Sequence, residues 1–483
     1  MLTSTLGTTG DAAWTYPVWI THFQDVAYLI AAVLFVIGLK LLASPRTARR
    51  GNLIASFGML LAIGATLFVE GVLSLVWIGA AAALGAAVGL TLALRIQMTA
   101  MPQLVALFNG FGGLASVLVV GSEYARRFDT AESSITFDQG MTMGLSVLIG
   151  AVTFTGSLVA FGKLQGLIAG RPRQWSGQLI GNVALLVITL AGSVALGLHP
   201  DWWYLVPMAA LLAGVLGITL TIAIGGADMP VMVALLNSYS GLAACATGFI
   251  LDPPNKALIV SGALVGASGI ILTSIMCKAM NRSLANVLFG GVGTDDGGGA
   301  PGAAPGEDRV VRTTDPEDLA IMLDGCQKVV IVPGYGMAVA QAQHAVRDLF
   351  NKLEDRGCRV IFGIHPVAGR MPGHMNVLLA EVDIPYDRLL DLDATNAEID
   401  SAEMAIVLGA NDVVNPAARS DRSSPIYGMP IIDVDKAQTV IVCKRSLGAG
   451  YAGVQNELFF APNTLMLFGD AKSTMSSVVQ SVE

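Results

Sequence analysis

The sequence predicts an α-helical membrane bundle of about nine transmembrane helices, followed by an α/β domain built on a doubly wound parallel sheet. Three observations lead to this fold class. The chain is 53% hydrophobic and 13% charged, with a mean hydropathy of +0.64, unlike an ordinary soluble protein. Its first half repeats apolar stretches of spanning length. From about residue 315, short strand patterns alternate with helical ones.

The expected membrane spans are apolar stretches long enough to cross a hydrocarbon core. They cover residues 26–43, 53–69, 72–94, 103–121, 141–162, 178–198, 204–224, 231–251 and 257–277. The second and third are joined by a tight turn near Glu70, where the count of spans is easiest to mistake.

Positive charges orient the expected bundle. Lys and Arg follow the odd-numbered spans, as at Arg95, Lys163 and Lys278. The connections after even-numbered spans are acidic or aromatic, with Arg126 and Arg127 as exceptions among acidic neighbours. Because cytoplasmic loops are enriched in Lys and Arg, we expect the N-terminus outside and the C-terminal domain in the cytoplasm.

Composition divides the chain further. Residues 1–289 carry 13 Lys+Arg and 10 Asp+Glu, whereas residues 290–483 carry 15 Lys+Arg and 26 Asp+Glu. The C-terminal part is therefore an acidic domain, which is unsuited to binding nucleic acid. A Gly/Pro/Ala-rich stretch between the halves is expected to be a flexible tether. The predicted organisation is an extracytoplasmic segment 1–25, a transmembrane domain 26–285, a linker 286–312 and a cytoplasmic C-terminal domain 313–483.

The five cysteines stand singly, without a CxxC or Cys/His cluster, so no metal site is expected and a reducing compartment fits. The first basic residue, Lys40, lies beyond the start of the first apolar segment, so no cleavable signal is expected.

An internal repeat relates two of the expected spans. Residues 101–115 align with residues 229–243 at an offset of 128, with 9 of 15 positions identical. Each copy places an asparagine, Asn109 or Asn237, about 10 Å into the membrane at 1.5 Å per residue. Two interpretations remain open, since such amides either join helices by hydrogen bonds or line a hydrated path.

Two charged residues flank this part of the bundle on its cytoplasmic side. Asp228, in the turn before the eighth span, is either a path residue or an ordinary solvated acid, and Arg282 is most simply a positive-inside anchor. None of the predicted spans contains a histidine, so a proton path made by this chain alone lacks the usual titrating group.

The C-terminal pattern predicts a Rossmann-like domain. Expected strands cover residues 328–332, 359–363, 405–408, 439–443 and 465–468, with weaker ones near Leu389 and Ile431. Expected helices cover residues 316–324, 338–355 and 370–380. Between the first strand and its helix stands Gly334-Tyr335-Gly336-Met337-Ala338-Val339, a GxGxxV turn of the kind that holds a dinucleotide pyrophosphate, although a glycine turn alone is a weak signal.

The type of nucleotide is suggested by the ends of other strands. The second strand does not end in the acid that would bind a ribose 2′-hydroxyl, and it continues to His365. Lys444-Arg445-Ser446 follows a later strand. Two cations and a hydroxyl favour a 2′-phosphate and hence NADP(H), although a solvated strand end is the simpler alternative.

Three further loops fall at the carboxyl ends of strands, where such sheets bind ligands. They span residues 367–372, 409–413 and 448–453, and Arg370 in the first suits a phosphate. Asp412 is a candidate to sense a nicotinamide or a proton, with a helix N-cap as an equally good alternative.

Taken together, these residues resemble the β subunit of proton-translocating NAD(P) transhydrogenase over essentially the whole chain. The resemblance rests on nine motifs. They are Gly-Ala-Asp228-Met-Pro, Leu-Leu-Asn237-Ser-Tyr-Ser, Ile-Met-Cys-Lys-Ala-Met-Asn-Arg282-Ser, Pro-Gly334-Tyr-Gly-Met-Ala-Val-Ala-Gln, His365-Pro-Val-Ala-Gly-Arg-Met-Pro-Gly-His-Met, Gly409-Ala-Asn-Asp-Val-Val-Asn-Pro, Lys444-Arg-Ser, Gly450-Tyr-Ala-Gly-Val-Gln-Asn and Leu467-Phe-Gly-Asp-Ala-Lys.

The resemblance implies hydride transfer from NADH to NADP⁺ driven by inward proton flow, in a multi-pass protein of the cell (inner) membrane. It implies an NADP(H) site made by Gly334, Tyr335, Gly336, Met337, Ala338, Val339, Val367, Ala368, Gly369, Arg370, Met371, Pro372, Gly409, Ala410, Asn411, Asp412, Val413, Gly428, Met429, Lys444, Arg445, Ser446, Leu447, Gly448, Ala449, Gly450, Tyr451, Asp470 and Ala471. Asp412 would communicate protonation to it. Asn109, Asp228, Asn237 and Arg282 would belong to the proton path.

The resemblance also implies a partner. Some family members carry a membrane histidine where this chain has Asn109, so the titrating group is expected on a partner's helix. One dinucleotide fingerprint cannot serve two nicotinamides. The NAD(H) site and additional membrane helices are therefore expected on transhydrogenase α subunits, in a dimer of heteromers. A nucleotide-gated channel or transporter is the main alternative, although no carbonyl filter sequence is present. A membrane NADPH–quinone reductase would need a flavin or metal relay, which the cysteine pattern does not offer.

Overall fold

The computed structural model describes residues 18–42, 44–67, 75–130, 135–170, 172–251, 254–289, 310–371, 373–424, 426–450 and 452–482. Contacts divide the chain into two compact units. One comprises Met1–Arg95 with Asn255–Ser261, and the other comprises Ile96–Pro254 with Gly262–Glu483. Residues 1–17 of the predicted extracytoplasmic segment and most of the predicted linker lie outside the described residues, whereas residues 18–25 of that segment belong to the first helix.

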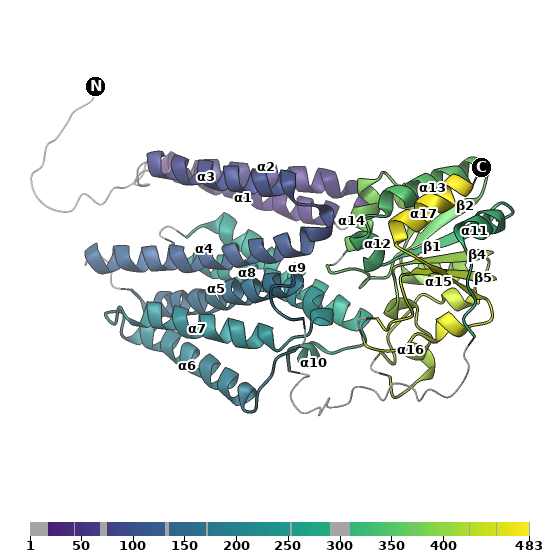
Figure 1. Ribbon diagram of the computed structural model, residues 1–483. Coiled ribbons are helices and arrows are strands. Elements are labelled where there is room, and N and C mark those ends of the chain that lie inside the picture. The colour runs from purple at the N-terminus through teal and green to yellow at the C-terminus, as the bar shows by residue number, and fades with distance from the viewer. Residues whose placement is uncertain are drawn as a thin grey trace, which may run out of the picture. The chain divides into compact units, whose positions relative to one another are not determined.

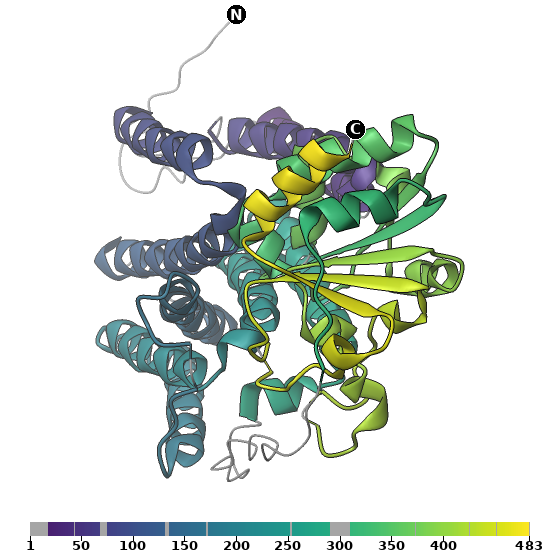
Figure 2. The same cartoon turned by 45° about the vertical axis from the view of Figure 1, so that its right-hand side comes forward.

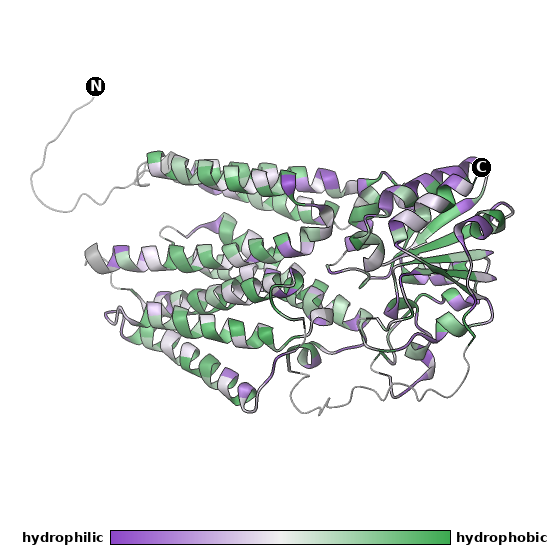
Figure 3. Cartoon of the chain, in the orientation of Figure 1, coloured by the Kyte–Doolittle hydropathy of each residue, from purple (hydrophilic) through white to green (hydrophobic). Residues whose placement is uncertain are grey.

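Nine helices among the described residues are long and apolar enough to cross a membrane, as predicted. They are α1 (Val18–Leu42), α2 (Pro45–Leu67), α3 (Leu75–Arg95), α4 (Met101–Thr130), α5 (Phe137–Leu164), α6 (Gln178–Leu198), α7 (Leu205–Ile222), α8 (Met229–Ile250) and α9 (Lys256–Ala279). Figure 3 shows apolar residues along all of these helices. The turn near Glu70 lies outside the described residues.

One predicted span ends too early. The fourth was expected to stop at residue 121, but α4 continues to Thr130 and carries Glu123, Arg126 and Arg127 inside the helix. These charges lie three and four residues apart and pair with one another, which allows the helix to continue beyond its apolar part.

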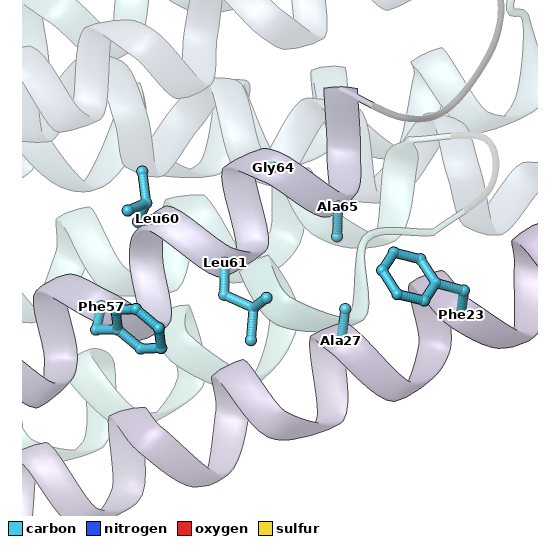
Figure 4. A pocket seen from close by; sticks show the side chains of 7 residues that line it. All are labelled: Phe23, Ala27, Phe57, Leu60, Leu61, Gly64 and Ala65. Carbon is cyan, nitrogen blue, oxygen red and sulfur yellow. The ribbon is translucent and has the colours of Figure 1, made fainter.

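In the first unit, α1 and α2 pack closely. A side chain at Gly51 would meet the Gly38 carbonyl oxygen at 2.7 Å, and Tyr28 Oη lies 2.9 Å from Thr66 Oγ1 across the pair. An apolar pocket between the two helices is lined by Phe23, Ala27, Phe57, Leu60, Leu61, Gly64 and Ala65 (Figure 4). It contains none of the predicted site residues.

In the second unit, α5 is the most buried of the spanning helices and contacts α4, α6, α7 and α8 (Figure 1). Glycines permit this packing. A Cβ atom at Gly113 of α4 would meet the Gly150 carbonyl oxygen of α5 at 2.5 Å, so these backbones touch directly. Beyond α9, the short helix α10 (Leu284–Phe289) ends the described part of the membrane half.

The C-terminal domain is a doubly wound sheet, as predicted. Six parallel strands run in the order β3-β2-β1-β4-β5-β6. Their bounds are β1 Lys328–Pro333, β2 Arg359–Gly363, β3 Leu389–Leu390, β4 Met404–Leu408, β5 Thr439–Lys444 and β6 Thr464–Phe468. The central strands β1 and β4 are buried along almost their whole length, as expected of a sheet covered on both faces.

Helices cover the two faces of this sheet unequally. One face packs against α11 (Pro316–Leu323), α12 (Tyr335–Val339), α13 (Gln343–Asp355), α14 (His374–Glu381) and α17 (Ala471–Ser481). The other packs against α15 (Leu392–Ile399) and short turns that include Val434 and Phe459. Figure 2 shows the strands side by side with α13 and α17 on one face.

Three sequence predictions for this domain were wrong in detail. The helix expected over residues 338–355 is broken between α12 and α13, where Gln341 has a φ of +52° that a regular helix does not allow. The expected strand near Ile431 is irregular backbone, and the Ile431 carbonyl oxygen accepts a hydrogen bond from the Asn396 side chain rather than from the backbone of a neighbouring strand. The helices α15 and α17 were not predicted, since their sequences are short or rich in serine.

Gly409 should be the least replaceable glycine of the domain. It has a φ of +67°, and an added Cβ would overlap the backbone of Gly336 and Met337. We expect Gly409→Ala to lower the unfolding free energy of the soluble fragment 310–483 by about 2–4 kcal/mol. Gly357 has a φ of +84° but open space around it, so Gly357→Ala should cost only about 1 kcal/mol. Equal losses in urea denaturation would contradict this packing argument.

Candidate functional site

The carboxyl edge of the sheet gathers most of the predicted nucleotide-site residues. Loops leave this edge at Gly334 after β1, Gly409 after β4 and Arg445 after β5. The chain turns to opposite sides after β1 and β4, which makes a topological switch point, the usual place for a ligand in such sheets. The structure therefore brings together residues that lie more than 100 positions apart in the sequence.

At the switch point the glycine turn packs against the loop after β4. The Gly334 N–H donates to the Leu408 carbonyl oxygen at 2.8 Å, and the Gly336 N–H donates to the Gly409 carbonyl oxygen at 3.0 Å. A Cβ at Gly334 would overlap Ala410. These glycines are thus required by contact between two loops, a reason that a nucleotide fingerprint alone does not reveal.

Asp412 joins two of the loops. Its Oδ2 accepts the Ala452 N–H at 2.9 Å, and a side chain at Gly450 would meet its carboxylate. The alternative that Asp412 caps a helix is wrong, because the short 3₁₀ turn Asp412–Val414 has no side-chain cap. Asp412 instead links the loop after β4 to the loop after β5.

The basic cluster Lys444-Arg445-Ser446 lies at the end of β5, where the sequence predicted it. Lys444 lies above the Phe459 ring, with Nζ 4.7 Å from the ring centroid, and donates to the Gly448 carbonyl oxygen. Burial lowers the pKa of Lys444, and the nearby Asp412 carboxylate opposes this shift. Arg445 and Ser446 are exposed beside it, and the Ser446 hydroxyl accepts the Gly448 N–H at 3.4 Å.

Arg370 belongs to an aromatic and histidine group after β2. Its guanidinium carbon lies 4.1 Å from the Tyr335 ring centroid, and its backbone N–H donates to His374 Nδ1 at 3.0 Å. His365 donates from Nε2 to the Pro430 carbonyl oxygen at 2.8 Å and accepts the Val367 N–H at Nδ1, 3.3 Å away. The two histidines therefore hold the backbone of the loop that carries Arg370.

The remaining predicted site residues have contacts that explain local structure and do not indicate a ligand. Met429 is buried in a small cluster with Ala417, Ala418 and Ile426, next to Gly428 with its φ of +76°. Asp470 caps α17 by accepting the Lys472 N–H at 3.1 Å, and Ala471 begins that helix. Pro372 and Tyr451 lie outside the described residues.

The two repeat asparagines lie on helices that pack against each other, α4 and α8. Asn109 is buried, and its Nδ2 donates to the Val233 carbonyl oxygen of α8 at 3.2 Å. Asn237 is half-buried one turn further along α8, beside Ser238, whose hydroxyl donates to the Gly266 carbonyl oxygen at 2.6 Å. The Asn109 contact is therefore a hydrogen bond between two helices, the first of the two interpretations that the sequence left open.

Asp228 and Arg282 form an ion pair that the sequence did not reveal. Arg282 Nη1 lies 2.9 Å from Asp228 Oδ2 and 3.2 Å from Oδ1. Asp228 is 8% exposed, so it is not an ordinary solvated acid. Burial raises the pKa of Asp228, and the Arg282 charge opposes this rise. The pKa of the Asp228 carboxyl therefore lies above that of an ordinary surface aspartate.

Sequence reasoning missed Lys163, which it treated only as a positive-inside residue. Its buried ammonium donates to the Ile222 carbonyl oxygen at 2.7 Å and to the Ile224 carbonyl oxygen at 2.6 Å. Both carbonyls immediately precede the turn that carries Asp228, and the Gly226 N–H bonds to the Gly170 carbonyl oxygen at 2.9 Å. Lys163 thus fixes the turn that presents Asp228. No spacing rule in the sequence signals this contact.

In the part of the chain that the structure describes, nine apolar helices are joined to a doubly wound sheet with polar loops gathered at its carboxyl edge, which defines a multi-pass membrane protein with a dinucleotide-type domain. The chain belongs to the NAD(P) transhydrogenase beta subunit family, whose pattern matches residues 24–481. Two relatives from Rhodospirillum rubrum, both named NAD(P) transhydrogenase subunit beta, are 50% identical to it over 470 residues, which cover 96% of this chain and 100% of each relative. The predicted resemblance is confirmed, and the family name implies an alpha-subunit partner.

The buried histidines should make the C-terminal domain sensitive to acid. Burial lowers the pKa of both His365 and His374 to about 4, from about 6.5 in the unfolded chain. Because the folded domain keeps both histidines neutral, their contribution to the unfolding free energy is fully present above pH 6.5 and is lost as the pH falls from 6.5 through 4. For each histidine, the unfolding free energy should fall by about 2 kcal/mol between pH 7 and pH 5. His374→Gln should therefore flatten this loss in urea titrations of fragment 310–483, and an unchanged slope would contradict the assignment.

Proposed function

We propose that this chain supplies the NADP(H) site and most of the membrane proton path of a complex that transfers hydride from NADH to NADP⁺ as protons flow inward. The observation that carries the proposal is the gathering of the loops after β1, β2, β4 and β5 at one sheet edge, in a chain that also has nine spanning helices among its described residues. Family membership supports the transhydrogenase activity itself.

The chemistry of the sheet edge favours NADP(H) over NAD(H). The strand β2 ends at Gly363, and the next residues are Ile364 and His365 rather than an acid for the ribose 2′-hydroxyl. The exposed Arg445 guanidinium, the Ser446 hydroxyl and the neighbouring Lys444 ammonium suit a 2′-phosphate. These three residues would hold that phosphate. Arg370, whose guanidinium lies over the Tyr335 ring, is the proposed partner of a second phosphate.

Asp412 is the proposed connection between protonation and the nucleotide. Its carboxylate accepts the Ala452 N–H and lies near Lys444, so it holds the loop after β5 by bonds that require its negative charge. Protonation of Asp412 would weaken both interactions and release that loop. When bound, NADP⁺ would supply the hydride-accepting nicotinamide, and the residues of this chain would orient and enclose it.

The membrane half of the proposal involves four residues. Asp228 and Arg282 form the cytoplasmic relay, since the Asp228 carboxylate is buried, the Arg282 side chain is partly exposed, and the pKa of Asp228 is raised. Asn109 and Asn237 line the path between α4 and α8, where Asn109 helps to hydrate it while a partner's helix carries the titrating group. The proposal has the C-terminal domain in the cytoplasm and the bundle in the inner membrane, and the positive charges after odd-numbered helices support this orientation.

Hydride transfer needs two nicotinamides, and this chain offers one such sheet edge in its described part. We therefore assign the NAD(H) site to the α subunit, in a dimer of heteromers. A purified complex of the two subunits should reduce NADP⁺ with NADH, and the β chain without its partner should not. Absence of this activity in an assembled, nucleotide-binding complex would favour the alternative of a nucleotide-gated channel or transporter.

The basic cluster should determine nucleotide choice. Removing Lys444 and Arg445 together should weaken NADPH binding about 100-fold while leaving NADH binding unchanged, because two charge-assisted bonds to the 2′-phosphate are lost. Arg445→Ala should cost more than Lys444→Ala, since Lys444 already donates to the Gly448 carbonyl oxygen. Lys436→Ala, which removes an exposed cation paired with Asp433, is the control. Calorimetry on fragment 310–483 that gives an unchanged NADPH:NADH ratio for the double variant would refute the assignment.

Asp228 should matter for coupling and not for nucleotide affinity. Asp228→Asn removes the charge that holds Arg282, so proton uptake coupled to hydride transfer should fall about tenfold or more in reconstituted vesicles. NADPH affinity of the C-terminal domain should stay at the wild-type value. Asp25→Asn breaks an exposed ion pair with Lys256 and serves as the control. Wild-type proton uptake by an assembled Asp228→Asn complex would exclude the proposed relay.

A further inference from the structure

The end of α4 remote from Asn109 carries a buried arginine that the proposed path does not use. Arg127 is 5% exposed and Glu123 is 8% exposed, and Arg127 Nε donates to Glu123 Oε1 at 2.7 Å. Arg127 lies 18 residues beyond Asn109 on one helix, which places it about 27 Å away along the axis. The pair therefore sits at the opposite end of the bundle from the Asp228 turn.

All three nitrogens of the guanidinium bond to different helices. Nη1 donates to Gln139 Oε1 of α5 at 2.8 Å, and Nη2 donates to the Ile250 carbonyl oxygen, the last residue of α8, at 2.8 Å. Next to it, the Tyr124 hydroxyl donates to the Pro200 carbonyl oxygen in the connection between α6 and α7, at 2.5 Å. One cation thus bonds to α4, α5 and α8 together.

An apolar layer lies directly inside this cation. Val120, Met143, Val147 and Ile250 are buried in one cluster with residues of α6 and α7. Two hydroxyls accompany this cluster at the depth of Val147, where Ser146 Oγ lies 2.8 Å from Thr247 Oγ1 and 3.2 Å from the Ala243 carbonyl oxygen. From the end of the bundle inward, the fixed positive charge therefore comes first, and buried apolar side chains with these paired hydroxyls follow it.

A stabilising role alone explains this arrangement poorly. Burying an ion pair costs desolvation that well-packed apolar side chains would avoid, so such pairs are weak evidence for stability. A permanent positive charge in a low-dielectric constriction, by contrast, opposes the entry of protons and other cations. Arg126, exposed on the same carboxylate, shows that Glu123 can also be neutralised without burying a cation.

We propose that Arg127, held by Glu123 and Gln139, is an electrostatic plug that excludes protons from the α4–α5–α8 end of the bundle. The inference rests on the proposed proton-translocating function and deepens it. If this end is closed, the remaining half of the proton path runs along a face of the bundle completed by a partner's helix. The plug then keeps the gradient from collapsing through the chain when no hydride is transferred.

The test is the passive proton permeability of vesicles that contain the assembled complex, without nucleotides. Arg127→Gln keeps a side chain able to donate to the Ile250 carbonyl oxygen but removes the charge, and it should raise the proton leak about tenfold or more. Arg127→Lys should restore a tight membrane. Arg126→Gln is the matched control and should behave as wild type. An assembled Arg127→Gln complex with a wild-type leak would overturn the proposal.

A second measurement does not depend on how Arg127→Gln folds. Ser146→Cys, in a chain with Cys245 and Cys277 changed to Ala, should resist a membrane-impermeant maleimide while Arg127 is present. Labelling of this thiol from the side of the α4 C-terminus would overturn the proposal. Failure of the proposed function is distinguishable, because it would abolish hydride-coupled proton uptake in wild type and leave the leak and labelling results unaffected.

Discussion

Charged side chains at the ends of apolar helices impose the constraint on which the bundle depends, because hydrocarbon offers them no hydrogen-bond partner. Each is satisfied by a different helix. Lys163 of α5 bonds to the Ile222 and Ile224 carbonyl oxygens after α7, Arg282 reaches Asp228 before α8, and Arg127 of α4 reaches α5 and α8. These bonds fix the ends of the helices, while hydroxyls and amides line the middle.

A second constraint acts in the C-terminal domain. Two glycine loops touch backbone to backbone between β1 and β4, which leaves no room for side chains at Gly334, Gly336 or Gly409. With this contact fixed, Asp412 is held where its carboxylate reaches the Ala452 N–H in the loop after β5. The proposed coupling uses this rigidity, because loss of the Asp412 charge would weaken a contact that joins the loops after β4 and β5.

Much of the fold follows from the sequence, since apolar run length and strand–helix alternation are local signals. They predicted the number of spans and the doubly wound sheet. The partners of Lys163, Asp228 and Arg127 were not predictable, because each bond joins segments far apart in the chain and depends on helix rotation. The break at Gln341 carried no glycine or proline signal. The role of Asp412 as a helix cap was equally plausible until its actual partner was known.

The central claim is that hydride transfer and proton crossing form one process in the complex that contains this chain. The most direct test measures the equilibrium between NADH with NADP⁺ and NAD⁺ with NADPH in sealed vesicles, with and without an imposed proton-motive force. One proton crossing 100 mV supplies about 2.3 kcal/mol, so an inward force of that size should shift the ratio about fifty-fold toward NADPH. An equilibrium that the force leaves unchanged, in vesicles that hold their gradient, would contradict the account.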